Sequence, residues 1–319
     1  MHKWEKLGEV FRIADHKKQP WMMEYCQAPN AIELENAIRI FFSTRESMDS
    51  GGKYRSYIAY VDVRKDNPLD IIGVSDHPVL SLGSLGSFDE FGTYPLSVTK
   101  KESDYIGLYG GWTRMASVPF DVSIGLVRGT QIDRLEKCGN GPVITRSQFQ
   151  PFICASPKIR YFHGKLFCYY TFGHSWTGNS RPDPSYSITL ATSTDGISWE
   201  RENKAIIPNT LGSLEAQASP DVFWQNGRYH MYFCYRSHRG FRENPDLGYK
   251  IGYASSQDLF VWQRDDSQHN LRPSDAGWDS DSISYPNVLQ VGSETYMFYL
   301  GKEIGRYSFG VARLASASN

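Results

Sequence analysis

The stretch Ala218-Ser219-Pro220-Asp221-Val222 is one copy of a short pattern that occurs five times in this chain of 319 residues. The other copies are centred on Pro29, Pro95, Pro157 and Pro286, so consecutive prolines are 66, 62, 63 and 66 residues apart. Such even spacing indicates a repeat architecture in which one supersecondary unit is used five times.

The residues around Pro220 show what one unit contains. A short strand over 221–225 leads into the hairpin turn Asn226-Gly227, and an aromatic strand over 229–235 follows. A third strand is predicted over 249–254 and an outer strand over 260–264. Asn-Gly supplies the positive φ angles that a tight hairpin requires. Four antiparallel strands in about 60 residues is the size of one propeller blade.

The fifth unit ends after its third strand, over 309–313. Trp4-Glu5 lies 25 residues before Pro29, much as Trp199-Glu200 lies 21 residues before Pro220. We therefore predict an all-β, five-bladed β-propeller that fills residues 1–319 as a single domain. The N-terminal strand closes the ring by completing the last blade.

Composition excludes several classes of partner. Lys plus Arg (34) nearly equals Asp plus Glu (35), which leaves no basic excess for nucleic acid or an anionic membrane. No apolar run is long enough to span a bilayer, so no membrane insertion is predicted. The five cysteines are dispersed and form no CxxC pair, which argues against a disulfide framework and a zinc site. These features predict a reducing, cytoplasmic location, and they carry no signal for the oligomeric state.

One repeat position is rich in carboxylates. The residues five positions before the prolines are Glu24, Glu90, Phe152, Glu215 and Asp281. Equivalent positions of propeller blades converge on the central channel, so these acids would crowd one channel mouth. Crowded carboxylates separate in pKa and can supply an acid and a base at neutral pH. The structural alternative is that the acids bond to backbone amides and tie blades together.

A second repeat position is rich in cations. The residues sixteen positions after the prolines are Arg45, Gly111, Gly173, Arg236 and Lys302. These cations could merely neutralise the acids. Together with nearby aromatic rings, however, the mouth suits a sugar, because rings stack on its C–H face and charged groups bond its hydroxyls. The predicted substrate-binding residues are Arg45, Trp112, Arg114, His174, Trp176, Tyr235, Arg236, Asp279, Tyr285 and Lys302.

Several motifs carry a family resemblance. Besides the repeated Pro segments and the acids at strand starts, they are Ser193-Thr194-Asp195-Gly196-Ile197-Ser198-Trp199, residues 88–92 (FDEFG), 110–112 (GGW), 277–280 (GWDS) and 296–299 (YMFY). The chain resembles the five-bladed propeller glycosidases, which include the arabinanase/xylosidase, invertase-like and mannoside-phosphorylase families. More narrowly, it is similar to glycosylase-like proteins of bacterial surface-polysaccharide biosynthesis clusters.

The resemblance implies roles for the carboxylates. Glu24 matches the base or nucleophile of blade one, and Glu90 matches the pKa-tuning acid of blade two. The acid of blade three is replaced by Phe152, so Glu215 or Asp281 would have to substitute for it. Some resembling enzymes hold calcium in the channel, but oxygen ligands leave no spacing signature. No cofactor is predicted, and channel calcium stays an open alternative.

The leading hypothesis is a glycoside hydrolase-like enzyme that acts on a glycosidic bond of a small bacterial sugar, with Glu215 as the proton donor. Glu24 or Asp281 would activate water or attack the anomeric carbon. The basic groups leave room for an acidic or nucleotide-linked sugar. The alternatives are a non-catalytic glycan-binding propeller and a sugar-nucleotide transferase or cyclase.

Overall fold

The computed structural model describes residues 1–16, 19–178, 182–212 and 215–315, and nearly all of their regular structure is β-strand. The elements of residues 1–201 are β1 (Trp4–Arg12), η1 (Ile13–His16), β2 (Glu24–Glu33), β3 (Ile38–Arg45), β4 (Ser56–Val63), β5 (Ile71–Val74), β6 (Gly92–Lys101), β7 (Asp104–Arg114), β8 (Phe120–Gly129), β9 (Glu136–Lys137), β10 (Cys154–Phe162), β11 (Lys165–Thr177), β12 (Asp183–Ser193) and β13 (Glu200–Arg201). The remaining elements are β14 (Glu215–Gln225), β15 (Arg228–Ser237), η3 (Pro245–Leu247), β16 (Lys250–Ser256), β17 (Gln263–Arg264), η4 (Asp266–Gln268), β18 (Ser284–Val291), β19 (Glu294–Leu300), α1 (Lys302–Gly305) and β20 (Ser308–Leu314).

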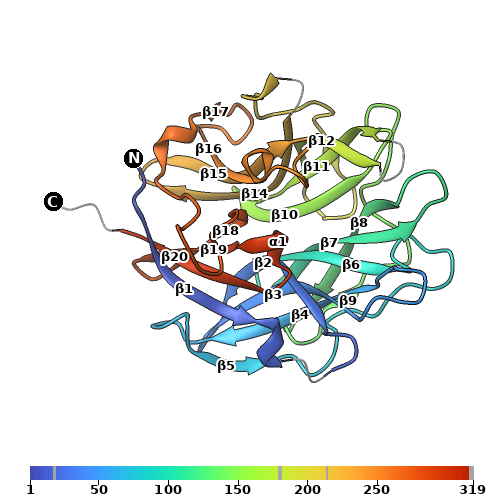
Figure 1. Ribbon diagram of the computed structural model, residues 1–319, viewed down its shortest axis with the longest axis horizontal. Helices are drawn as coiled ribbons and strands as arrows, with labels where there is room; N and C mark the ends of the chain where they lie inside the picture. Colours follow the sequence, from blue (N-terminus) through green and yellow to red (C-terminus); the bar gives the residue numbers. More distant parts are fainter. Residues whose placement is uncertain (17–18, 179–181, 213–214, 316–319) are drawn as a thin grey trace.

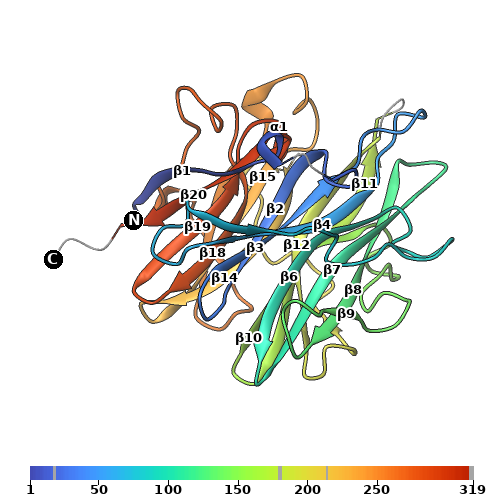
Figure 2. The ribbon, with the colours of Figure 1, turned by 90° about the horizontal axis from the view of Figure 1, so that it is seen from below.

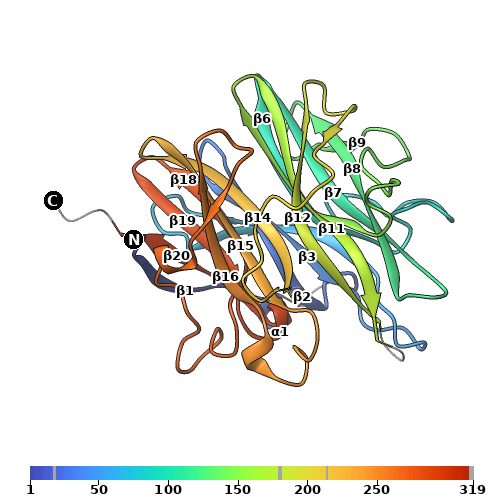
Figure 3. The ribbon, with the colours of Figure 1, turned by 90° about the horizontal axis from the view of Figure 1, so that it is seen from above.

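The strands pair in antiparallel groups of four. Three groups are separate sheets in the orders β10-β11-β12-β13, β14-β15-β16-β17 and β18-β19-β20-β1. The other two groups, β2-β3-β4-β5 and β6-β7-β8-β9, are joined into one sheet by a single parallel bridge between Ser56 and Gly92. Figure 1 shows these groups arranged around a common centre, and Figures 2 and 3 show the same ribbon from two sides.

The hydrophobic core lies between successive groups. Phe41 and Tyr109 belong to a cluster between the first two groups, and Phe172 belongs to the cluster between the next two. The series continues through clusters that contain Met231 and Met297. A last cluster joins strands β19 and β20 to β2, β3 and β4, so the final group packs on the first. Alternating aromatic and aliphatic side chains suit such face-to-face packing of sheets. These are the features of a β-propeller.

Each repeat proline marks a bulge in an innermost strand. The register shifts across Pro29, Pro95, Pro157, Pro220 and Pro286 in the five pairs that β2, β6, β10, β14 and β18 make with their neighbours. In four of the copies the residue before the proline has a φ between +49° and +52°. A bulge bends its strand and redirects side chains. As a result, all five prolines line one central cavity.

The two ends of the chain meet in the last sheet, as predicted. Trp4 of β1 pairs with Leu314 of β20, and the Trp4 indole donates a hydrogen bond of 3.0 Å to the Tyr232 hydroxyl of the neighbouring group. His2 forms a bridge with His269 and bonds the same hydroxyl at 2.6 Å. This seam therefore fastens the N-terminal strand to two groups at once.

Buried histidines make the seam sensitive to acid. His269 is 2% exposed, and burial lowers its pKa to about 4. The unfolded chain takes up this proton near pH 6.5, so the stabilising contribution is complete above that pH and is lost as the pH falls toward 4. We expect His269 alone to account for a loss of about 2–3 kcal/mol in the free energy of unfolding between pH 7 and 4.5, at 1.36 kcal/mol per pKa unit. Urea denaturation at the two pH values measures this loss.

The variant His269→Gln keeps a donor for the Ile251 carbonyl and an acceptor for the Leu271 amide, which are the two contacts of the imidazole. It should show a smaller loss on acidification than the wild type. His77→Gln changes an exposed histidine and should leave the loss unaltered. Equal losses in all three proteins would place the acid sensitivity elsewhere.

Candidate functional site

The central channel has a mouth, which we define as the end where the innermost strands begin. Here the structure separates the predicted acids into two kinds. Some lie in buried clusters that reach from an outer strand to the start of an innermost strand. The others are accessible at the mouth.

Four groups contain such a cluster, which we call a clamp. Lys137 of β9 contacts Asp89 at 2.5 Å, and the Tyr109 hydroxyl donates to the same oxygen at 2.8 Å. Lys6 of β1 and the Tyr299 hydroxyl contact Asp279 in the same way, at 2.7 and 3.0 Å. The other two clamps are Arg201 with Tyr170 and Gln150, and Arg264 with Glu215. The clamps connect the outer strands β9, β13, β17 and β1 to the residues that begin or precede the innermost strand of the same group.

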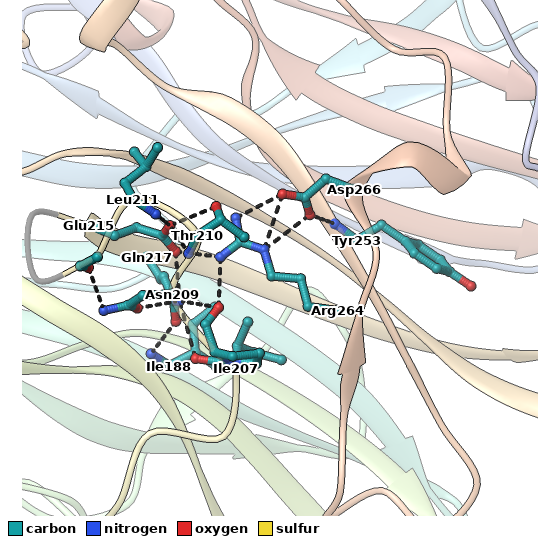
Figure 4. A network of polar contacts seen from close by, with 12 residues as sticks. Ile188, Ile207, Asn209, Thr210, Leu211, Glu215, Gln217, Tyr253, Arg264 and Asp266 are labelled. Carbon is teal, nitrogen blue, oxygen red and sulfur yellow. Dashed lines mark hydrogen bonds and ion pairs between the residues drawn. The ribbon is translucent and has the colours of Figure 1, made fainter.

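Glu215 is fully engaged in its clamp (Figure 4). One carboxylate oxygen accepts from Arg264 at 2.5 Å and from Gln217 at 2.8 Å. The other accepts from the amides of Thr210 and Leu211 and from the Thr210 hydroxyl, at 2.8, 3.0 and 3.1 Å. Five donor contacts leave this carboxylate little free acceptor capacity for a substrate. These contacts fit the structural alternative and argue against the predicted role of Glu215 as proton donor.

Asp279 was predicted to bind substrate, but its contacts are those of a clamp residue, and it is 2% exposed. Among the described residues, the first group shows no polar clamp, and buried Met22 and Phe42 belong to its hydrophobic core. Tyr235 also belongs to the clamp region, since the Arg264 guanidinium lies 4.3 Å above its ring.

Glu24 is accessible and lines a pocket. Glu24 is the first residue of β2, at the mouth, and its side chain is 26% exposed. The Tyr54 hydroxyl donates to it at 3.2 Å, and the Arg306 guanidinium lies 3.5 Å away. The pocket is further lined by Arg12 and Tyr307. A carboxylate between a phenol and a guanidinium, open to solvent on one side, is suited to acid–base or nucleophilic chemistry.

Asp281 and Glu24 are connected through the segment 301–307, which contains α1. Lys302 lies 3.7 Å from Asp281 at one end, and Arg306 contacts Glu24 at the other. Glu303 and Ile304 between them have φ angles of +49° and +55°. A β-branched residue is rarely found there, and such strain is concentrated at functional sites. Figure 1 shows α1 beside the innermost strands, near the centre of the ring.

Glu90 precedes β6 and is half-buried. Its carboxylate accepts a hydrogen bond of 2.9 Å from the Gly86 amide, a contact within its own loop. Of the four predicted catalytic carboxylates, Glu24, Glu90 and Asp281 thus stay outside the clamps.

Arg45 and Arg236 lack a carboxylate partner among the described residues. Arg236 is 3% exposed, donates to the Tyr186 hydroxyl at 2.9 Å, and has an Nε with no acceptor. Arg45 stacks on Tyr25 at 4.1 Å and donates to Gln27 at 3.0 Å. Burying a guanidinium without a counter-ion lowers the stability of the fold, and a bound anion would offset this loss.

Four tyrosines join these two arginines, and we call them the tyrosine row. The Arg45 charge acts on Tyr94, whose hydroxyl hydrogen bonds with Tyr285. The Tyr285 ring contacts Tyr249 edge-on at 5.8 Å. The Tyr249 hydroxyl bonds that of Tyr186 at 2.6 Å, and Tyr186 accepts from Arg236. The row therefore places largely buried aromatic rings and hydroxyls between two cations that lack a carboxylate partner among the described residues.

The remaining predicted residues lie at the ends of β7 and β11. The Trp112 indole donates to Ser56 at 2.7 Å, and Arg114 contacts Asp49 at 3.2 Å with its Nε unpaired. Trp176 is half-buried, whereas His174 is exposed and bonds the Ser187 hydroxyl at 2.8 Å. Trp112 and Trp176 pack against the same central cluster as Tyr285.

Several residues of the site were not predicted from the sequence, among them Tyr54, Tyr186, Tyr249 and Arg306. None of them occupies the two repeat positions that carry the acids and cations. Tyr94 and Tyr285 directly precede repeat prolines, so a search of that position would have pointed toward the row.

Residues 1–16, 19–178, 182–212 and 215–315 contain no group of three or more His, Cys, Asp or Glu side chains placed to hold a metal ion. They also contain no helix with the length and apolar character needed to cross a membrane.

Comparison of the whole sequence with family models gave no match. Two uncharacterized proteins of Mycobacterium tuberculosis, from strains CDC 1551 and H37Rv, are each 28% identical to this chain over 312 residues. The aligned region spans 98% of this chain and 99% of each relative. The similarity therefore extends over nearly the full length of both.

Solved structures share the fold. A putative glycoside hydrolase from Parabacteroides distasonis matches with a TM-score of 0.70 and 15% identity, over 100% of this chain and 98% of that one. A structure from the GH130 family of mannoside phosphorylases, which contains glycoside hydrolases that target β-1,2 mannosidic linkages, matches with a TM-score of 0.69 and 15% identity. The match covers 99% of this chain and 96% of that one. A β-1,2-mannobiose phosphorylase from Listeria innocua, solved with β-1,2-mannobiose, matches with a TM-score of 0.69 and 15% identity. The match covers 98% of this chain and 96% of that one. The chain thus shares the fold of these proteins.

Proposed function

We propose that this protein is a five-bladed β-propeller enzyme that acts on a glycosidic bond at the mouth of its channel. The observation that carries the proposal is Glu24, an accessible carboxylate that lines a pocket and is contacted by the Tyr54 hydroxyl and the Arg306 guanidinium. The five proline bulges around one cavity support the blade number. The glycoside hydrolases and phosphorylases with the same fold support the reaction class.

Glu24 and Asp281 form the proposed catalytic pair. One carboxyl group protonates the departing glycosidic oxygen, and the other takes a proton from water or attacks the anomeric carbon. Glu90 is retained as the carboxylate that influences their protonation. Glu215 is no longer assigned the acid role, because Arg264 and four further donor contacts hold its carboxylate.

The proposed substrate is a small sugar that bears an anionic group. The tyrosine row offers rings for the C–H face of a sugar, and Arg45 and Arg236 offer charge for a carboxylate or phosphate. Trp112, Arg114, His174, Trp176 and Lys302 stay as proposed contacts around the same mouth. From the resemblance, we also propose that the sugar belongs to bacterial surface polysaccharide, and from the cysteine usage that the protein works in the cytoplasm.

Product release from a panel of glycosides tests the proposal. The panel should pair each neutral glycoside with its uronate and its phosphorylated counterpart, and should include nucleotide sugars, each with and without inorganic phosphate. We expect turnover of at least one anionic member. Calorimetric binding without any product after long incubation would instead select a glycan-binding protein, and transfer without water would select a sugar-nucleotide transferase or cyclase.

The variant Arg236→Met tests the charge of the substrate. Hydrogen bonds to charged groups contribute about 1.5–3 kcal/mol, so affinity for an anionic glycoside should fall roughly 10- to 150-fold. Affinity for its neutral counterpart should change much less. Calorimetry of both ligands measures this difference, and Arg239→Met, at an exposed position three residues further on, is the matched control. Equal losses for both ligands would contradict anion recognition by Arg236.

Glycan binding without catalysis is the second candidate. It is favoured by the loss of two acids from the ring, since Phe152 replaces one and the clamp holds Glu215. Glu24, Glu90 and Asp281 count against it.

A further inference from the structure

A third repeat position carries buried polar side chains that meet in the channel. The residues directly after the prolines are Asn30, Leu96, Lys158, Asp221 and Asn287. The Lys158 ammonium lies 2.5 Å from the Asn30 side-chain oxygen and 3.3 Å from the Asp221 carboxylate. Asn287 donates to that carboxylate at 2.7 Å and accepts from the Ala31 amide at 2.7 Å. These contacts form a closed circuit through β2, β10, β14 and β18.

The circuit is buried and its acceptors are occupied. Asp221 is 0% exposed, and one of its oxygens also accepts from the Val288 amide at 2.6 Å. Its other oxygen is contacted by Arg160. The fifth innermost strand, β6, joins through Ser97, whose hydroxyl accepts from the Ile159 amide at 3.2 Å. The polar groups therefore link all five innermost strands.

These residues do not fit a channel calcium ion. Calcium takes six to eight oxygen ligands, with carboxylates to balance its charge. The circuit offers a single carboxylate, Asp221, and two cations, Lys158 and Arg160, already lie against it. A divalent ion would meet an excess of positive charge and oxygens already bonded to other donors.

We propose that Lys158 is the built-in cation of this channel and that the protein requires no channel metal. The Lys158 ammonium supplies the positive charge that contacts the Asn30 oxygen of β2 and the Asp221 carboxylate of β14, so these oxygens need no bound metal ion between them. This inference concerns the channel beyond the prolines and does not depend on the proposed function at the mouth.

Thermal unfolding of the full chain tests this proposal. It is best done at pH 6, because burial lowers the pKa of Lys158 to about 7 while Asp221 acts in the opposite direction. The wild-type melting temperature should be the same in EDTA and in millimolar calcium chloride, and elemental analysis should find no stoichiometric metal. Lys158→Met keeps a side chain of similar length but removes its charge, and should lower the melting temperature on the order of 5–10 °C.

Two further variants complete the experiment. Lys165→Met changes a half-exposed lysine on the adjoining β11 and should leave the melting temperature unchanged. Lys158→Arg keeps the charge and should lose less stability than Lys158→Met, a comparison that still holds if the Met variant folds poorly. The proposal is overturned if EDTA lowers the wild-type melting temperature, if metal copurifies at one ion per chain, or if Lys158→Met behaves like Lys165→Met.

Discussion

Glu24→Gln should reduce turnover by about 10²–10⁴-fold, the range associated with loss of a general acid or base. Glutamine keeps the shape of the side chain and can still accept the hydrogen bond from Tyr54. It cannot exchange a proton or attack an anomeric carbon. Because the Glu24 side chain is partly exposed and its ion pair with Arg306 is 3.5 Å long, stability should be nearly unchanged.

Glu46→Gln is the matched control for this experiment. Glu46 follows Arg45 and resembles Glu24 in having one tyrosine and one arginine partner, Tyr57 at 3.2 Å and Arg55 at 3.9 Å. It does not line the pocket that contains Glu24. Initial rates on a substrate from the glycoside panel, with melting temperatures measured in parallel, separate the two variants. Equal activity in Glu24→Gln and Glu46→Gln would remove Glu24 from the catalytic pair.

The repeat could be predicted from sequence because one backbone feature recurs at every copy. Each proline stands in a bulge of an innermost strand, and the Asn226-Gly227 turn marks the hairpin that follows Pro220. The pairing of β1 with β20 was predictable for a related reason. A sheet that lacks its outer strand at one end of the chain can be completed by a spare strand at the other end.

The destination of each acid could not be predicted in the same way. Counting five residues back from the proline assumes that every innermost strand is entered by a segment of equal length. The clamp residues Asp89, Gln150 and Asp279 lie six or seven residues before their prolines, whereas Glu215 lies five before. The single position five residues before each proline therefore groups Glu215, a clamp residue, with the acids at the mouth. The partner Arg264 lies 49 residues away, so no local pattern distinguishes Glu215 from Glu24.

The ring of residues after the prolines escaped detection because its members differ in chemistry. Asn30, Lys158, Asp221 and Asn287 complement one another across the channel, and complementarity produces dissimilar residue types. A search for one repeated residue type finds rings of like charge. It does not find circuits in which each member satisfies another.

The clamp of Glu215 leads to the second large effect. Arg264→Leu should lower the free energy of unfolding by about 3–5 kcal/mol, because it leaves a buried carboxylate without its counter-ion. The Arg264 and Glu215 side chains are 2% and 0% exposed, so water cannot replace the lost contact without opening the sheet. Arg313→Leu removes an exposed cation from β20 that pairs with Glu5, and should leave the stability unaltered. Urea denaturation measures both changes.

A double-mutant cycle with Glu215→Gln determines which role this carboxylate has. If the two groups stabilise the fold through each other, neutralising Glu215 in the Arg264→Leu background should recover part of the lost stability, since no buried charge is left unpaired. Turnover by the folded fraction of Glu215→Gln should stay within a few-fold of the wild type. If Glu215→Gln instead abolishes turnover while the free energy of unfolding is unchanged, Glu215 returns to the catalytic pair. The five donor contacts of Glu215 would then position a catalytic carboxylate, and would not serve mainly to hold β17 against β14.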